Sequence, residues 1–161
     1  MADSDGNTTL YFAYGSCMDN VRLREHGVHH LFLDVVGRGV IYGYRLAFTR
    51  RVGEHAYADI IPDPESRVEG KVYRLPPPAV DYLDEREGRG TAYDRVWLEM
   101  EVNGTTMSPV LSYTVIDKCE PELPPPKRYA EEILRGAKGT VSPRYLEDLR
   151  RRLRRKFKME V

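Results

Sequence analysis

The chain has 161 residues, of which 41% are hydrophobic and 31% charged, and its mean hydropathy is −0.54. This is enough apolar material for one core, because a domain typically holds roughly 100–200 residues. Two cysteines are too few for a disulfide-rich scaffold, and no apolar run approaches the roughly 20 residues that span a bilayer. The acidic, polar start is unlike a signal peptide, so we expect a cytoplasmic protein.

The formal net charge of zero hides an uneven distribution. Seven basic residues and no acidic one lie between Arg150 and Lys158, so 18 basic residues face 25 acidic ones in the rest of the chain. A net-acidic body argues against a nucleic acid as the main partner, because domains that bind nucleic acids are usually basic.

The chain begins with a predicted strand and a short helix. Residues 10–14 are apolar and aromatic and are ended by Gly15, which is typical of a buried strand. Residues 18–26 could form a short helix with Ser16 near its N-terminus. We expect residues 1–8 to be a flexible tail and the folded domain to cover residues 9–161.

A glycine-bent sheet is predicted for the next part of the chain. Residues 35–48 are rich in β-branched and aromatic side chains, which predicts a strand. Glycines inside a strand pattern indicate bends or bulges of a small curled sheet; here they are Gly37, Gly39 and Gly43. Two more strands are expected at residues 57–61 and 68–75.

A helix and a hairpin follow. The proline triplet at residues 76–78 is expected to open the helix, which should end at Gly88, because proline is tolerated in a first helical turn. Residues 96–102 then alternate, with Val96, Leu98, Met100 and Val102 on one face and Trp97, Glu99 and Glu101 on the other, which predicts a strand. Asn103-Gly104 is a strong signal for a hairpin turn, so residues 107–116 should form the antiparallel partner.

Two helices are predicted near the C-terminus. The first ends near residues 136–139, and the second covers about residues 142–157, with Ser142 as N-cap and Pro143 as its first residue. Strands and helices do not alternate regularly, which favours the α+β class. We expect a single domain, a small mixed, Gly-bent β-barrel flanked by helices.

The segment from Tyr14 to Met18 is the first candidate site. It lies where a strand ends and a helix is expected to begin, and backbone N–H groups at such a junction can bind an anion. Gly15 would let a ligand approach the backbone closely. A tight turn with no ligand is the alternative.

Glu87 is the second candidate. It precedes the glycine that ends its helix, where a carboxylate faces the negative end of the helix dipole. That field, together with partial burial, should raise the pKa of Glu87, as suits a general base working near neutral pH. The alternative is a solvated acidic surface, because Asp81, Asp84 and Glu85 are close in sequence.

The remaining candidates carry weaker signals. Eleven tyrosines against four phenylalanines indicate a polar pocket, although tyrosine is also common on sheet surfaces. The four histidines lack metal-ligand spacing, so no metal site is expected. No histidine base is implicated for Cys17, and we expect no thiol chemistry.

Several short motifs occur in a specific order. They are residues 11–18 (YFAYGSCM), 70–75 (GKVYRL), 83–88 (LDEREG), Tyr93, 125–129, 136–138 and 145–149. Each is weak alone, but together they make the chain resemble the gamma-glutamylcyclotransferase family, including its AIG2-like branch, over about residues 9–149.

The resemblance implies a cavity at the Tyr14-Gly15-Ser16 loop and a reaction without a metal or organic cofactor. In that reaction the α-amine of a γ-glutamyl group attacks its own γ-carbonyl, 5-oxoproline forms, and an amine or peptide leaves. Carried over by position, Glu87 is the general acid/base. The substrate-binding residues would be Tyr14, Gly15, Ser16, Cys17, Met18, Tyr93 and Tyr129.

Two departures from the family pattern leave the substrate open. The family's usual asparagine after Tyr-Gly-Ser is Cys17 here, and a usual serine is Pro126. The expected partner is a small γ-glutamyl compound, with no membrane and no nucleic acid, and a homodimer is left open. The alternatives are a non-catalytic module that binds a small ligand, and a basic C-terminal helix that acts as an arm for nucleic acid or an acidic partner. Against the arm, Glu147–Arg151 and Asp148–Arg152 have the spacing of helical ion pairs.

Overall fold

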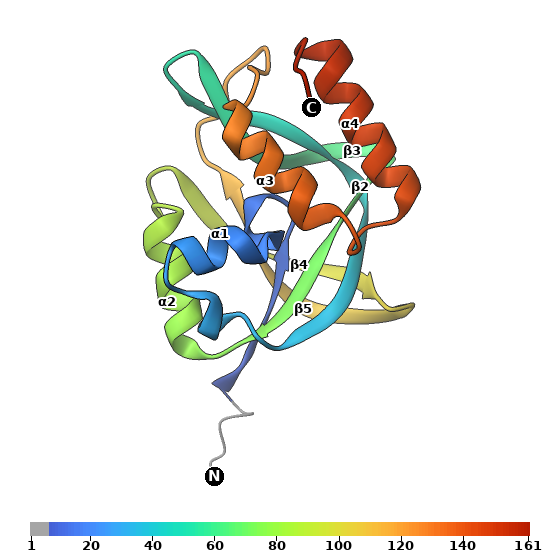
Figure 1. Cartoon of the computed structure of the whole chain (residues 1–161). Coiled ribbons are helices and arrows are strands. Elements are labelled where there is room, and N and C mark those ends of the chain that lie inside the picture. Colours follow the sequence, from blue (N-terminus) through green and yellow to red (C-terminus); the bar gives the residue numbers. More distant parts are fainter. Residues whose placement is uncertain (1–6) are drawn as a thin grey trace.

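A computed structural model describes residues 7–161, so the expected tail lies, as far as residue 6, outside the described residues. Within these residues five strands close into a barrel in the order β1-β3-β2-β4-β5, and helices surround it (Figure 1). The strands pair antiparallel except for β1 and β5, which are parallel. The predicted α+β class and the mixed barrel flanked by helices are confirmed.

The bounds of the elements are as follows. The strands are β1 (Thr9–Ala13), β2 (Val35–Val52), β3 (His55–Leu75), β4 (Tyr93–Val102) and β5 (Thr105–Val115). The helices are α1 (Asn20–Glu25), α2 (Pro77–Arg86), α3 (Lys127–Ala137) and α4 (Pro143–Lys156), with 3-10 turns η2 (Ser16–Met18) and η3 (His29–Leu31). None of the helices within residues 7–161 combines the length and apolar character needed to cross a membrane.

The strands β2 and β3 differ from the prediction. The two strands expected at residues 57–61 and 68–75 are one continuous strand, and β2 runs past residue 48 to Val52. Pro62 and Pro64 suggest a break, but Pro62 pairs with Tyr44 next to a register shift, where a proline is tolerated in a sheet. Of the three glycines predicted to mark bends or bulges, Gly37 and Gly43 coincide with register shifts, and Gly43 has a φ of 86° that favours glycine. Gly39 stays in register opposite Gly70, with no bulge.

The hairpin between β4 and β5 follows the sequence closely. Leu98, Met100 and Val102 are buried, while the residues between them are exposed. Asn103 and Gly104 have φ angles of 52° and 81°, and they connect the paired residues Val102 and Thr105. A tight hairpin turn of this kind needs positive φ at both central residues, so the Asn-Gly prediction is confirmed.

The helix ends are set by local chemistry. The α2 helix starts at Pro77, and the chain leaves it at Glu87 and Gly88, where Gly88 has a φ of 61°. The Ser142 side chain accepts a hydrogen bond from the N–H of Tyr145 at the start of α4, as predicted. The prediction for residues 18–26 is wrong in detail: a 3-10 turn precedes α1, and its N-cap is Asp19, which accepts from Val21, rather than Ser16.

A buried carboxylate fastens α4 to the barrel. Glu122 accepts hydrogen bonds from Arg45 at 3.1 Å, from Arg152 and Lys156 at 2.7 Å each, and from the N–H of Phe48 at 2.8 Å. Burial alone would raise the pKa of Glu122, but these contacts lower it to about 2. The carboxylate is therefore charged in the folded protein and joins α4 to β2.

This contact corrects one predicted ion pair. Arg152 does not pair with Asp148, because its guanidinium turns inward to Glu122 and to the carbonyl of Leu46. Asp148 pairs with Arg151 instead, at 3.1 Å. The predicted pair between Glu147 and Arg151 is present, at 3.7 Å.

Replacing Glu122 with Gln should lower the free energy of unfolding by about 2 kcal/mol, because hydrogen bonds to charged groups contribute roughly 1.5–3 kcal/mol. The folded pKa lies below the ordinary value of 4.5, so this stabilisation is complete above that value and is lost as the pH falls toward 2. Urea unfolding of both proteins at about pH 7 and about pH 3 measures the difference and its decrease. Glu120→Gln, a change at an exposed carboxylate, is the control; an equal loss in that variant would contradict the assignment.

Candidate active site

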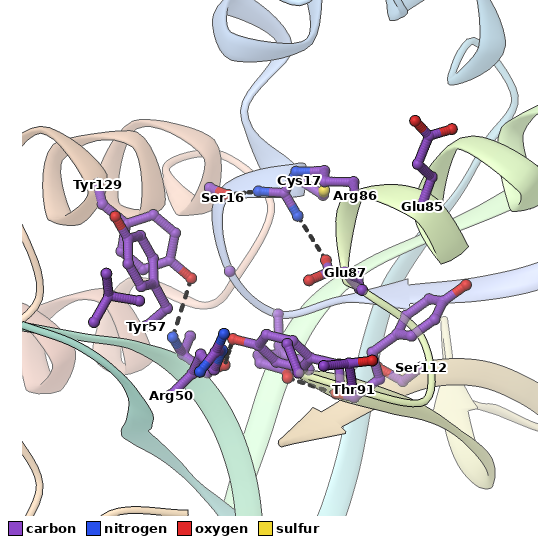
Figure 2. Close-up of a pocket in the computed structure, with 18 of the residues that line it drawn as sticks. Ser16, Cys17, Arg50, Tyr57, Glu85, Arg86, Glu87, Thr91, Ser112 and Tyr129 are labelled. Atoms are coloured by element: carbon purple, nitrogen blue, oxygen red, sulfur yellow. Dashed lines mark hydrogen bonds and ion pairs between the residues drawn. The ribbon is translucent and has the colours of Figure 1, made fainter. Parts of the chain in front are cut away.

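A cavity of about 500 Å³ lies between the loop that follows β1 and the C-terminal end of α2 (Figure 2). It brings together residues that are distant in the sequence. Of the predicted site residues, those that line it are Tyr14, Gly15, Ser16, Cys17, Glu87, Tyr93 and Tyr129. The two candidate segments therefore face one shared space.

Met18 is the exception. Its side chain is buried in the core and is not among the residues that line the cavity. Its N–H donates to the carbonyl of Gly15 at 3.2 Å, which closes the 3-10 turn. Met18 therefore supports the loop from behind, and the expectation that it contacts the substrate is corrected.

The loop that lines the cavity has backbone N–H groups without a carbonyl partner. β1 ends at Ala13, and the chain turns at Gly15 into the 3-10 turn. Within residues 7–161, the N–H groups of Gly15, Ser16 and Cys17 donate to no backbone carbonyl. Such a group of free N–H donors can bind a carboxylate or a developing oxyanion.

Contacts from behind hold this loop. The hydroxyl of Tyr73 donates to the carbonyl of Cys17 at 2.8 Å, and Arg135 forms an ion pair with the buried Asp19 at 2.5 Å. Gly136 of α3 packs directly on the backbone of the turn, where a Cβ would lie 2.6 Å from the nitrogen of Asp19. These contacts join the loop to β3 and α3.

Glu87 lies at the end of α2 with its side chain 14% exposed. Its Oε1 is 2.6 Å from Nη1 of Arg86, and Nη2 of the same arginine donates to Oγ of Ser16 at 2.9 Å (Figure 2). Burial raises the pKa of Glu87, while the positive charges of Arg86 and Arg22 partly offset that rise. The carboxylate is thus desolvated, oriented by Arg86, and linked through it to the loop.

Tyrosine hydroxyls form the other polar part of the cavity. Tyr93 donates to the carbonyl of Ala58 at 2.7 Å, and Tyr129 accepts from the N–H of the same residue at 3.2 Å (Figure 2). Tyr14 donates to the carbonyl of Tyr113 at 2.6 Å. Burial raises the pKa of Tyr14, Tyr93 and Tyr129, so all three are neutral hydrogen-bonding groups at physiological pH.

Sequence reasoning missed two arginines that line the cavity. Arg86 is adjacent to Glu87 at the helix end, and this position could have been a signal. Arg50 comes from the distant β2–β3 hairpin together with Val52 and Tyr57. These residues reach the cavity only because the hairpin folds over it, so their role could not be predicted from the sequence pattern.

The Cys17 side chain is buried, and Nη1 of Arg22 donates to its Sγ over a long 4.0 Å. We expect Cys17→Ser to keep kcat/KM for the γ-glutamyl reaction that the resemblance implies within about tenfold, or 1.4 kcal/mol in the barrier, because no histidine of the described residues lines the cavity to activate the thiol. Comparing kcat/KM of the two proteins tests this. A far larger loss in a folded variant would show that the thiol takes part.

Comparison with known proteins identifies the family of the chain. Residues 11–132 match the family model described as "Gamma-glutamyl cyclotransferase, AIG2-like". The chain therefore belongs to the gamma-glutamyl cyclotransferase family, as its resemblance indicates. Among its relatives is YkqA from Bacillus subtilis (strain 168), which is 40% identical over 154 residues, 95% of this chain and 55% of YkqA.

Solved structures show the same fold. The crystal structure of YkqA matches with a TM-score of 0.87 over 92% of this chain and 55% of that chain, so this chain spans about half the length of YkqA. A structure described as a gamma-glutamyl cyclotransferase matches with a TM-score of 0.76 at 23% identity, covering 89% and 86% of the two chains. A yeast enzyme described as specific to glutathione matches with a TM-score of 0.64 at 15% identity, covering 94% and 97%. At these last two identities the likeness concerns the fold alone.

Proposed function

We propose that this protein releases 5-oxoproline from a γ-glutamyl amine or peptide, with Glu87 as the general acid/base. The observation that carries the proposal is one cavity that contains a desolvated carboxylate and a loop of free N–H donors, joined by Arg86. Membership of the family supports the reaction class.

The chemistry requires proton transfer and charge stabilisation. An α-ammonium group becomes a nucleophile only after losing a proton, which Glu87 accepts. The α-nitrogen then bonds to the γ-carbonyl carbon and gives a tetrahedral oxyanion. When the original C–N bond breaks, Glu87 passes this proton to the leaving nitrogen. A second proton then moves from the α-nitrogen to the leaving amine by the same route, so a neutral lactam and an ammonium group are formed and no water is consumed.

The loop supplies the complementary donors. The N–H groups of Gly15, Ser16 and Cys17 are free to bind the oxyanion and the substrate's α-carboxylate. The tyrosines around the cavity restrict the γ-glutamyl chain to a ring-closing conformation. Such orientation is effective because well-placed intramolecular reactions reach effective molarities of about 10⁵–10⁸ M.

A panel of γ-glutamyl compounds tests the proposal. The purified protein is incubated with γ-glutamyl dipeptides, γ-glutamyl amines and glutathione, the substrate that the yeast neighbour's description names. We expect 5-oxoproline in amounts equal to the released amine. Free glutamate as the product would instead show attack by water, and cleavage of an N-acetylated substrate would show that the α-amine is not the nucleophile.

The pH dependence should depend on Arg86. Activity needs the unprotonated carboxylate, so it should fall on acidification as the pH passes through the raised pKa of Glu87. Arg86→Met removes a charge that lowers this pKa, and we expect the acidic limb of kcat/KM to move to higher pH. Arg89→Met, which changes an exposed arginine outside the cavity lining, should leave the limb in place. A limb that stays fixed or moves to lower pH in Arg86→Met would contradict the role of Glu87 as base.

Two alternatives are less well supported. A module that only binds a small ligand does not need a desolvated carboxylate beside free N–H donors. For the basic arm, Arg151, Arg152 and Lys156 of α4 already form ion pairs within the protein. These pairs favour a helix that is a structural part of the domain.

A further inference from the structure

The cavity contains a second arginine that the proposed chemistry leaves unused. Arg50 lies near the end of β2 and lines the cavity together with Val52 and Tyr57. Figure 2 shows Arg50 on the Tyr57 side of the cavity, away from Arg86 and Glu87. The two guanidinium groups therefore occupy different parts of the space that a substrate would fill.

The two arginines also differ in their partners. Both terminal nitrogens of Arg86 donate hydrogen bonds, one to Glu87 and one to Ser16. Arg50 is half-buried and forms no ion pair within residues 7–161; its Nη1 donates only a long 3.4 Å hydrogen bond to the carbonyl of Arg51. A guanidinium has five N–H donors, so most of those on Arg50 remain available to a ligand.

The proposed function already assigns a partner in the cavity to each charged group of the γ-glutamyl moiety. Its α-ammonium is assigned to Glu87, and its α-carboxylate to the N–H donors of the loop. What remains of the substrate is the leaving group, which must extend into the rest of the cavity, where Arg50 lies. A leaving amino acid or peptide carries a carboxylate that suits a guanidinium, whereas a simple amine carries none.

We propose that Arg50 is a specificity-determining residue that binds a carboxylate of the leaving group, so that the protein prefers γ-glutamyl amino acids or peptides over γ-glutamyl amines. This inference rests on the proposed function of the same cavity. Val52 and Tyr57 lie beside Arg50 and offer apolar contact to the side chain of the leaving residue.

Substrates that differ only in the carboxylate test the inference. One pair is γ-glutamyl-alanine and γ-glutamyl-alaninamide, and a second pair carries one further glycine, which separates amino-acid from peptide leaving groups. For at least one pair, kcat/KM of the wild-type protein should be about tenfold or more higher for the substrate with the carboxylate than for its amide. This is the effect expected of a charge-assisted hydrogen bond. Arg50→Gln should remove that preference, because it should raise KM for the substrate with the carboxylate far more than KM for the amide.

Arg51→Gln is the matched control, because Arg51 is exposed on the same hairpin and does not line the cavity. It should keep the wild-type preference. Equal preference in wild type and Arg50→Gln for both pairs, or an equal loss in Arg51→Gln, would overturn the inference.

The outcomes separate this inference from the proposed function. Release of 5-oxoproline from acid and amide at equal rates would leave the function standing and reject the role of Arg50. Absence of 5-oxoproline from every substrate would reject the function, and the inference with it. Calorimetric binding of the same pairs to Glu87→Gln and to Glu87→Gln combined with Arg50→Gln measures recognition with little turnover. The preference for the carboxylate should be present in the first protein and absent in the second.

Discussion

Replacing Glu87 with Gln should reduce the turnover of γ-glutamyl substrates at least a hundredfold, because general acid–base catalysis typically contributes about 10²–10⁴-fold. The substitution keeps the size of the side chain and a hydrogen bond to Arg86 but removes basicity. The protein should stay folded, because burial disfavours the charged carboxylate and the C-terminal end of α2 repels it. Stability should therefore hold or rise slightly while activity is lost.

Asp81→Asn provides the control for this experiment. Asp81 is an exposed carboxylate on the same helix and does not line the cavity, so its substitution should leave kcat/KM unchanged. Thermal unfolding of both variants separates catalytic loss from structural loss. An active Glu87→Gln protein would contradict the assignment, and an unfolded one would make Glu87 a structural residue.

The second large effect is expected at Gly136, far from Glu87 in the sequence. A Cβ there would lie 2.6 Å from both the nitrogen of Asp19 and the carbonyl carbon of Met18, which are backbone atoms that cannot move aside alone. Gly136→Ala should push α3 away from the substrate loop and cost about 1–3 kcal/mol of stability, as overpacking does. The loop N–H donors would then move by up to about 1 Å. Because catalysis depends on exact orientation, kcat/KM should fall by up to about a hundredfold.

Glu131→Ala, which introduces the same residue at an exposed site on α3, should change neither stability nor activity appreciably. Urea unfolding and kcat/KM are measured for both variants. A Gly136→Ala protein with wild-type activity would show that the loop does not depend on its contact with α3.

Features set by neighbouring residues could be predicted from the sequence. The Asn103-Gly104 turn and the Ser142 cap depend on local backbone chemistry, and both are present. Features set by distant partners could not. The strand β3 continues through Pro62 because β2 pairs with it, and Arg152 leaves Asp148 because the buried Glu122 is available.

The candidate site also contains some residues that local sequence predicts and others that only the fold brings to the cavity. The Tyr14–Cys17 segment and Glu87 were recognisable because each is tied to a strand or helix end, and the fold brings them to one cavity. Arg50 lies in an ordinary strand sequence, and only the closure of the barrel places it at the site. Met18 follows the loop directly, yet it turns into the core because the 3-10 turn reverses the chain there.

A single-turnover assay measures directly whether 5-oxoproline is formed and whether its formation depends on Glu87. An excess of wild-type or Glu87→Gln protein is mixed with γ-glutamyl-alanine, and 5-oxoproline, glutamate and alanine are measured over time. We expect equal amounts of 5-oxoproline and alanine, no glutamate, and at least a hundredfold slower reaction with Glu87→Gln, because general acid–base catalysis contributes at least about 10²-fold. Equal rates for the two proteins, or glutamate in place of 5-oxoproline, would contradict the proposed function.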